Sequence, residues 1–122
     1  MNHQINVNYT SPSGTVVAQA SATGNVNLEL DLVVPASSTN YLVDTVDFPI
    51  TGLQAVLFYS AVDMTVKTNS SSAPDQTITL VAGVPFFWTY GNGTDPITAA
   101  ISKIYVTSTA GGTLNVRALW NA

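Results

Sequence analysis

Cysteine is absent from the 122-residue chain, and histidine occurs once, as His3. Without cysteine the chain has no disulfide, no thiolate nucleophile and no thiolate ligand for zinc, and its redox compartment stays undetermined. His3 belongs to a terminus that we expect to be mobile, whereas a general base must be held within hydrogen-bonding distance of the group it deprotonates. With no G-x-S-x-G elbow either, the sequence fixes no Ser-His-Asp or Cys-His arrangement in place.

Charged residues are scarce. Asp, Glu, Lys and Arg make up 8% of the chain, whereas about 25% is typical of soluble domains. The net charge is -4, and the only certain cations are Lys67, Lys103 and Arg117. Because a phosphate backbone is bound through several lysine or arginine contacts, we expect no nucleic-acid partner. The polar surface must instead consist mainly of hydroxyl and amide side chains.

Long apolar runs are also missing. No segment approaches the roughly 18 apolar residues of a membrane-spanning helix. The start of the chain, MNHQINVNYT (1–10), lacks the basic and apolar regions of a signal peptide. We therefore expect no membrane association, and synthesis in the cytoplasm without a secretion signal.

The few carboxylates form no recognisable catalytic or metal site. Glu29 and Asp31 share one face of an alternating segment, and Asp44 and Asp47 are close in sequence. A glycosidase needs two carboxyl groups about 5 to 9.5 Å apart across a cleft, and nothing here specifies that geometry, so we interpret these acids as solvated strand positions. The stretch NGTD (92–95) lacks the alternating acids of a calcium loop and is interpreted as a turn. The sequence thus predicts a non-enzymatic protein with no catalytic residue, no cofactor and no metal.

The dominant pattern that is present is an alternation of apolar and polar residues. INVNY (5–9) and NVNLELDLVV (25–34) each place their apolar side chains on one face of a strand. Clusters of Gly, Pro, Asn and Ser separate such segments along the chain. Ten strands are predicted, over residues 5–9, 14–22, 25–34, 41–48, 53–59, 61–68, 76–82, 84–90, 103–109 and 113–120. Short strands at regular spacing favour a single all-β domain that spans residues 1–122. We expect it to fold as an antiparallel β-sandwich or barrel.

Only one segment favours a helix. In DPITAAIS (95–102), Asp95 can cap a first turn, Pro96 suits the first helical position and two alanines follow. We expect at most one short helix there, of one or two turns.

Four aromatic residues are concentrated in AGVPFFWTYGNG (82–93). In a strand, Phe86, Trp88 and Tyr90 share one face and Phe87 points to the other. We interpret the shared face as core, with Trp88 and Tyr90 near its rim, because the last predicted strand alternates likewise. The alternative is a stacking platform for a sugar. Phe87 is either covered by a loop or exposed at an interface.

The segments TITLVAGVPFFWTY (77–90) and ISKIYVTSTAGGTLNVRALW (101–120) resemble parts of small β-rich virion structural proteins of tailed bacteriophages, including capsid decoration (cement) and head-associated proteins. The resemblance implies a jelly-roll or related sandwich, and an immunoglobulin-like sandwich stays the alternative because strand order cannot be derived from the sequence. It also implies a dimer or trimer that clamps neighbouring capsid subunits, and it brings no catalytic residue. Residues 1–13 would then form an N-terminal arm or an edge strand that adds to a partner's sheet.

The leading functional expectation is a virion structural protein, most specifically a decoration protein that binds and stabilises the head lattice. It would be made in the host cytoplasm and located in the virion. Its partners would be the major capsid protein, other virion proteins and further copies of itself. The alternative is a carbohydrate- or receptor-binding β-sandwich of a phage fibre or surface protein, which solvent exposure of Trp88, Tyr90 or Trp120 would favour.

Three residues are candidate partner contacts: Phe87, Phe58 and Tyr9. Alternation or position turns each of them away from the most obvious core face. Phe58 lies in LQAVLFYSAV (53–62), which is apolar on both faces. Either a central strand covered on both sides or an outer face covered by a neighbouring subunit would explain this segment.

Overall fold

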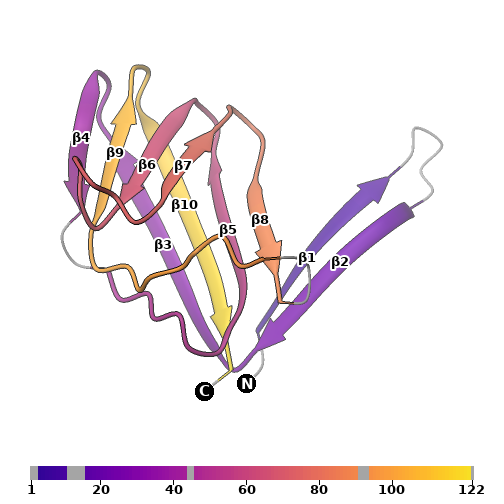
Figure 1. Ribbon diagram of the computed structural model, residues 1–122. Coiled ribbons are helices and arrows are strands. Elements are labelled where there is room, and N and C mark those ends of the chain that lie inside the picture. Colours follow the sequence, from indigo (N-terminus) through magenta and orange to yellow (C-terminus); the bar gives the residue numbers. More distant parts are fainter. Residues whose placement is uncertain (1–2, 11–15, 44–45, 91–93, 122) are drawn as a thin grey trace.

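The computed structural model describes residues 3–10, 16–43, 46–90 and 94–121, with side chains for Gln4 and from Gly24 onward. These residues form ten β-strands and no helix (Figure 1), so the predicted all-β class is confirmed. Relative to the predicted strands, β4 starts earlier and ends earlier, and β6 and β8 are shorter. The strands are β1 (His3–Thr10), β2 (Val16–Gly24), β3 (Val26–Val34), β4 (Ser38–Val43), β5 (Leu53–Ser60), β6 (Met64–Thr68), β7 (Thr77–Leu80), β8 (Phe86–Thr89), β9 (Ile104–Ser108) and β10 (Gly112–Trp120).

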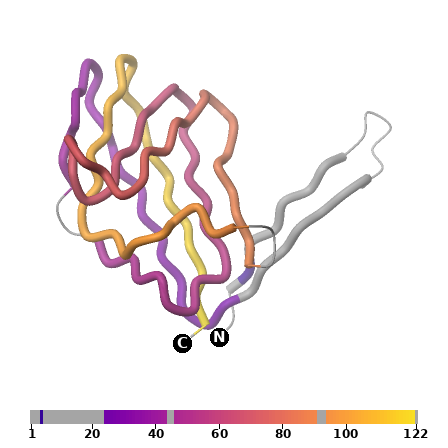
Figure 2. Tube along the Cα trace, viewed as in Figure 1, coloured from indigo at the N-terminus to yellow at the C-terminus, as the bar shows by residue number. Residues whose placement is uncertain are grey.

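Eight of these strands form two four-stranded antiparallel sheets in a sandwich-like arrangement. The first sheet has the order β3-β10-β5-β8 and the second sheet the order β4-β9-β6-β7. The chain passes between the sheets six times, from β3 to β4, β4 to β5, β5 to β6, β7 to β8, β8 to β9 and β9 to β10. Figures 1 and 2 show the turns from β3 to β4, β5 to β6, β7 to β8 and β9 to β10 at the same end of the two layers.

The hydrophobic core lies between the inner faces of the two sheets. In the first sheet, Phe58 and Val116 are cross-strand partners, and Val56 continues the same face. In the second sheet, Val66 and Val106 face each other across β6 and β9. All five side chains are buried. On β6 and β9, the residues that alternate with the buried ones point to the outer face of the sheet. Burial of this apolar surface is the main stabilising contribution to the fold.

A third, two-stranded sheet is formed by β1 and β2, which among the described strands pair only with each other. Figure 1 shows this hairpin outside the two four-stranded layers, and β2 lies against β10, β5 and β8 of the first sheet. Gly24 ends β2 where the chain crosses β10, and a Cβ there would lie 2.6 Å from the carbonyl oxygen of Trp120 and 3.1 Å from the Cβ of Leu119. Only glycine allows so close an approach of two backbones. Beside this crossing, Leu119 and Ala55 are buried on the outer face of the first sheet.

The helix predicted near residues 95–102 is wrong. Asp95 does cap a turn, because its Oδ1 accepts a hydrogen bond of 2.8 Å from the backbone N–H of Ile97. The chain then runs without helical hydrogen bonds, and Ile101 forms an isolated bridge with Phe48 through backbone hydrogen bonds of 2.9 and 3.2 Å. Ile97 and Ile101 are both buried. A short isolated helix is marginal in water, so pairing with a distant segment and burial in the core prevail over the local helical signal.

Candidate functional site

The aromatic segment is divided between core and surface. Phe86 packs against the core and Trp88 is buried, at 7% exposed, which confirms the core interpretation for both. Tyr90, just beyond the end of β8, is 74% exposed. Trp120 is buried, and its Nε1 donates a hydrogen bond of 2.7 Å to the carbonyl oxygen of Pro49. Tyr90 is therefore the one of the three candidate stacking residues that reaches solvent.

The three candidate partner contacts occupy different environments. Phe58 is 1% exposed and packs edge-on against Phe86, with ring centroids 6.0 Å apart, so its side chain offers no surface to a partner. Phe87 lies on the outer face of the first sheet opposite Leu57, and it is half-buried. Tyr9 belongs to β1, and its side chain lies outside the described residues. Of the two side chains that the structure describes, Phe87 is the one available at a surface.

Tyr90 borders a hollow of about 510 Å³ at the end of the first sheet. Its backbone is anchored, because its N–H donates a hydrogen bond of 2.7 Å to the carbonyl oxygen of Gln54 near the start of β5. Gln54, Asp95 and Ile50 line the hollow beside it, together with the buried Trp88. Sequence reasoning singled out Tyr90 and missed this grouping, because the pairing of β5 with β8 brings the segments together.

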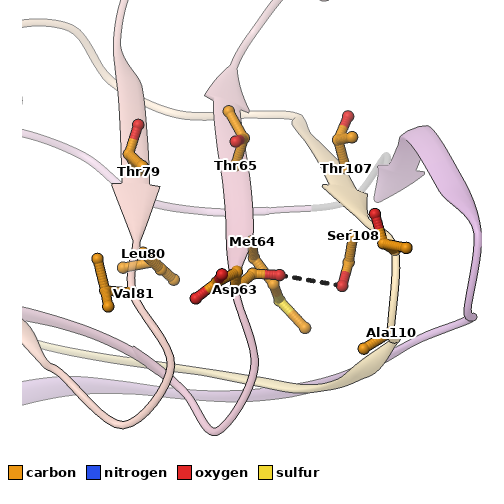
Figure 3. A pocket seen from close by; sticks show the side chains of 10 residues that line it. Asp63, Met64, Thr65, Thr79, Leu80, Val81, Thr107, Ser108 and Ala110 are labelled. Carbon is orange, nitrogen blue, oxygen red and sulfur yellow. Dashed lines mark hydrogen bonds between the residues drawn. The ribbon is translucent and has the colours of Figure 1, made fainter.

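A second hollow, of about 460 Å³, lies on the outer face of the second sheet (Figure 3). Thr79, Thr65 and Thr107 are direct cross-strand partners on β7, β6 and β9, so their side chains form one row across three neighbouring strands. The row is extended at β4, where the backbone N–H of Asn40 donates a hydrogen bond of 3.0 Å to Oγ1 of Thr107. This face therefore offers hydroxyl donors and acceptors at the regular spacing of strands, about 4.8 Å.

Asp63 and Ser108 lie beside this threonine row, just before the start of β6 and at the end of β9 (Figure 3). Ser108 Oγ donates a hydrogen bond of 3.1 Å to the carbonyl oxygen of Asp63 and accepts one of 3.1 Å from the N–H of Gly111. The Asp63 carboxylate accepts a hydrogen bond of 2.8 Å from the N–H of Ala82. Both side chains thus hold neighbouring turns together. No base is among the hydrogen-bond partners of Ser108 in the part of the chain that the structure describes.

An ion pair lies on the outer face of the first sheet. Arg117 Nη1 is 2.9 Å from Asp31 Oδ1, and Asn115 Nδ2 donates a hydrogen bond of 2.6 Å to the same oxygen. The hydrogen bond from Arg117, followed by that from Asn115, lowers the pKa of Asp31 below its ordinary value. Glu29 is exposed on the same strand. The exposure of both acids agrees with their interpretation as solvated strand positions.

Within the described residues, no group of three or more His, Cys, Asp or Glu side chains is placed to hold a metal ion. In the same residues, no helix is long and apolar enough to cross a membrane. Asp44, residues 92–93 of the predicted turn and the side chain of His3 lie outside the described residues.

Comparison of the chain with protein-family models, curated proteins and solved structures finds no match.

Proposed function

We propose that this chain is a non-enzymatic virion structural protein, a capsid decoration (cement) protein that binds and stabilises the head lattice of a tailed bacteriophage. The observation that carries the proposal is the strand order of the two four-stranded sheets, taken with the resemblance of residues 77–90 and 101–120 to virion proteins. A fold alone does not determine function, so the surfaces must also suit attachment to a lattice.

The strand order supports a jelly roll. The strands pair in nested order, β3 with β10, β4 with β9, β5 with β8 and β6 with β7. One long antiparallel ribbon folded over into two sheets has this pattern, and the pairs of β10 with β5 and of β6 with β9 complete the sheets. Double-sheet jelly rolls of eight strands occur in viral capsid and lectin domains. Immunoglobulin-like sandwiches have a different sheet order, with about seven or nine strands, so we favour the jelly roll.

The outer face of the second sheet suits contact with another protein. Its threonine row, Thr79, Thr65 and Thr107, carries hydroxyl groups rather than ionised groups. Lys67 lies on the same face, but it is half-buried, and its Nζ donates a hydrogen bond of 3.2 Å to the carbonyl oxygen of Ser71. Hydroxyl groups cost less to desolvate than charges, and Lys and Glu are depleted at protein interfaces. This face is therefore the proposed capsid contact.

The β1–β2 hairpin supports assembly with further copies of the chain. Because β1 and β2 pair only with each other, each has one backbone edge without a strand partner among the described strands. Such an edge can add to the sheet of another subunit through main-chain hydrogen bonds. We propose a dimer or trimer in which the hairpin, as an N-terminal arm, contacts a neighbouring subunit.

Two measurements on the purified chain test this function. Light scattering gives the oligomeric state, and co-sedimentation with heads of the phage that encodes the chain gives binding to the lattice. We expect a discrete dimer or trimer that sediments with the heads and saturates them. A chain that ignores the heads, and is absent from purified particles, would contradict the proposed function.

A pair of matched substitutions tests the proposed face. Thr79→Arg places a bulky cation on the outer face of the second sheet, and we expect head binding to weaken by about tenfold or more. Thr113→Arg makes the same change at an exposed threonine of β10 on the first sheet and should leave binding unchanged. Equal loss in the two variants would contradict the choice of face while leaving the lattice function intact.

A further inference from the structure

Tyr90 is the most exposed aromatic side chain that the structure describes, at 74%. Its position is nevertheless fixed, because its backbone N–H is bonded to the carbonyl oxygen of Gln54 at 2.7 Å. An anchored tyrosine presents a large, flat contact area, and only two side-chain torsions have to be ordered on binding. A ligand that stacks on the ring would bury this exposed apolar surface.

Polar groups surround the ring on the same hollow. Gln54 Nε2 makes a long hydrogen bond of 3.4 Å to the carbonyl oxygen of Gly52, and its amide oxygen accepts none from the described residues. Asp95 Oδ1 accepts the hydrogen bond from Ile97, and its second carboxylate oxygen has no partner within the described residues. Two acceptors, an amide donor and an aromatic ring thus face one space of about 510 Å³, within the range of about 300 to 1,000 Å³ typical of ligand sites.

We propose that this hollow, lined by Tyr90, Gln54, Asp95 and Ile50, binds a neutral saccharide. A sugar ring has apolar C–H faces, which stack on an aromatic ring, and hydroxyl groups at its edge, which donate to carboxylate and amide oxygens. Phosphates and uronic acids are disfavoured, because the hollow carries the Asp95 carboxylate and is lined by no lysine or arginine among the described residues. The proposal does not depend on attachment to a phage head.

The floor of the hollow supplies a reporter. Leu53 and Trp88 are buried there, so the ligand would meet a packed surface rather than a mobile one. The chain has two tryptophans, and the other, Trp120, lines a different hollow with Pro49. The two indole N–H resonances therefore separate binding at this hollow from binding elsewhere.

The test is a titration of the full chain with methyl glycosides of glucose, galactose, mannose, rhamnose and N-acetylglucosamine, followed by the indole resonances. At least one of these sugars should shift the Trp88 signal in a saturable way and leave the Trp120 signal in place. Methyl glucuronide should not compete. Absence of a saturable Trp88 shift with every neutral sugar, or equal competition by the glucuronide, would overturn the proposal.

Three variants assign the binding to the proposed groups. Tyr90→Ala should weaken binding about tenfold by removing the stacking surface. Asp95→Asn keeps an oxygen for the Ile97 hydrogen bond, removes the charge and should weaken binding severalfold. Tyr41→Ala, at an exposed tyrosine of β4 in the second sheet, is the matched control and should bind as the unaltered chain does. Tyr90→Ala binding that equals the control would overturn the proposal, and unchanged thermal unfolding shows that each variant is folded.

Discussion

Phe58→Ala tests the packing of the two sheets most directly. The ring of Phe58 is 1% exposed, meets the ring of Phe86 edge-on at 6.0 Å and faces Val116 across the pair of β5 and β10. Hydrogen bonds to β10 on one edge and to β8 on the other hold β5 in place. Because the backbone cannot move inward, removal of the ring leaves a cavity that the structure closes only in part.

We expect Phe58→Ala to lower the free energy of unfolding by about 4 kcal/mol, since a buried phenylalanine replaced by alanine costs about 3 to 5 kcal/mol. For a small domain with a total stability of about 5 to 15 kcal/mol, this lowers Tm by roughly 15 °C. Urea unfolding followed by tryptophan fluorescence measures the change. The dependence of the free energy on urea should keep its slope, because the variant exposes the same surface on unfolding.

Phe87→Ala is the matched control. Phe87 follows Phe86 on β8, but its side chain points to the outer face of the sheet and is half-buried. We expect a cost of about 1 kcal/mol, in the range of partly exposed positions. A cost below about 1.5 kcal/mol for Phe58→Ala, or equal costs for the two variants, would refute the assignment of inner and outer faces to β5 and β8. A stable Phe87→Ala variant also serves in the light-scattering test, where loss of the dimer or trimer would support Phe87 as a contact between subunits.

Two further predictions concern turns and charge. Gly111 and Gly83 both have left-handed backbone angles, with φ of 72° and 75°, but a Cβ on Gly111 would meet the backbone of the β3–β4 turn whereas one on Gly83 would meet nothing within 4 Å. Calorimetry should therefore show about 1 kcal/mol lost in Gly83→Ala from backbone strain alone, and about 3 kcal/mol in Gly111→Ala; similar losses would contradict this account. The lowered pKa of Asp31, caused first by its hydrogen bond from Arg117, contributes stability above the ordinary value of 3.8 that is lost as the pH falls through the lowered value. Urea unfolding against pH should thus show the stability advantage over Asp31→Asn shrinking below pH 3.8, and a constant difference would contradict the linkage.

The strands were predictable because alternation is a local property of the sequence and sheet faces impose it directly. On β10, Val116 points into the core and Arg117 points out, as a period of two requires. The rule fails at the end of the same strand, where Leu119 and Trp120 are both buried. The pairing of β10 with β5 shifts register between these two residues, and β2 lies against β10 from the outer side. Neither the shift nor the covering hairpin can be seen in the strand's own residues.

The grouping around Tyr90 was not predictable for a related reason. The exposure of Tyr90 follows from its place beyond the last pair of β8 with β5, and its polar neighbours Gln54 and Asp95 come from segments distant in sequence. Sheet register decides which side chains share a hollow, and register depends on nonlocal pairing. The threonine row has the same origin, since each threonine is visible as an outward strand position but their alignment depends on the pairs of β7, β6 and β9.

The apolar character of both faces of β5 is explained partly by the chain itself. β5 is an inner strand of the first sheet, and β2 lies against it on the outer side, where Ala55 is fully buried. Farther along the same face, Leu57 and Phe87 are cross-strand partners and both stay half-buried. β2 also lies against β8, the strand that carries Phe87. A neighbouring subunit that covers Leu57 and Phe87 would therefore lie next to the hairpin. The proposed arm contact and the Phe87 contact then belong to one continuous surface. Both contacts should be lost together when the hairpin is displaced.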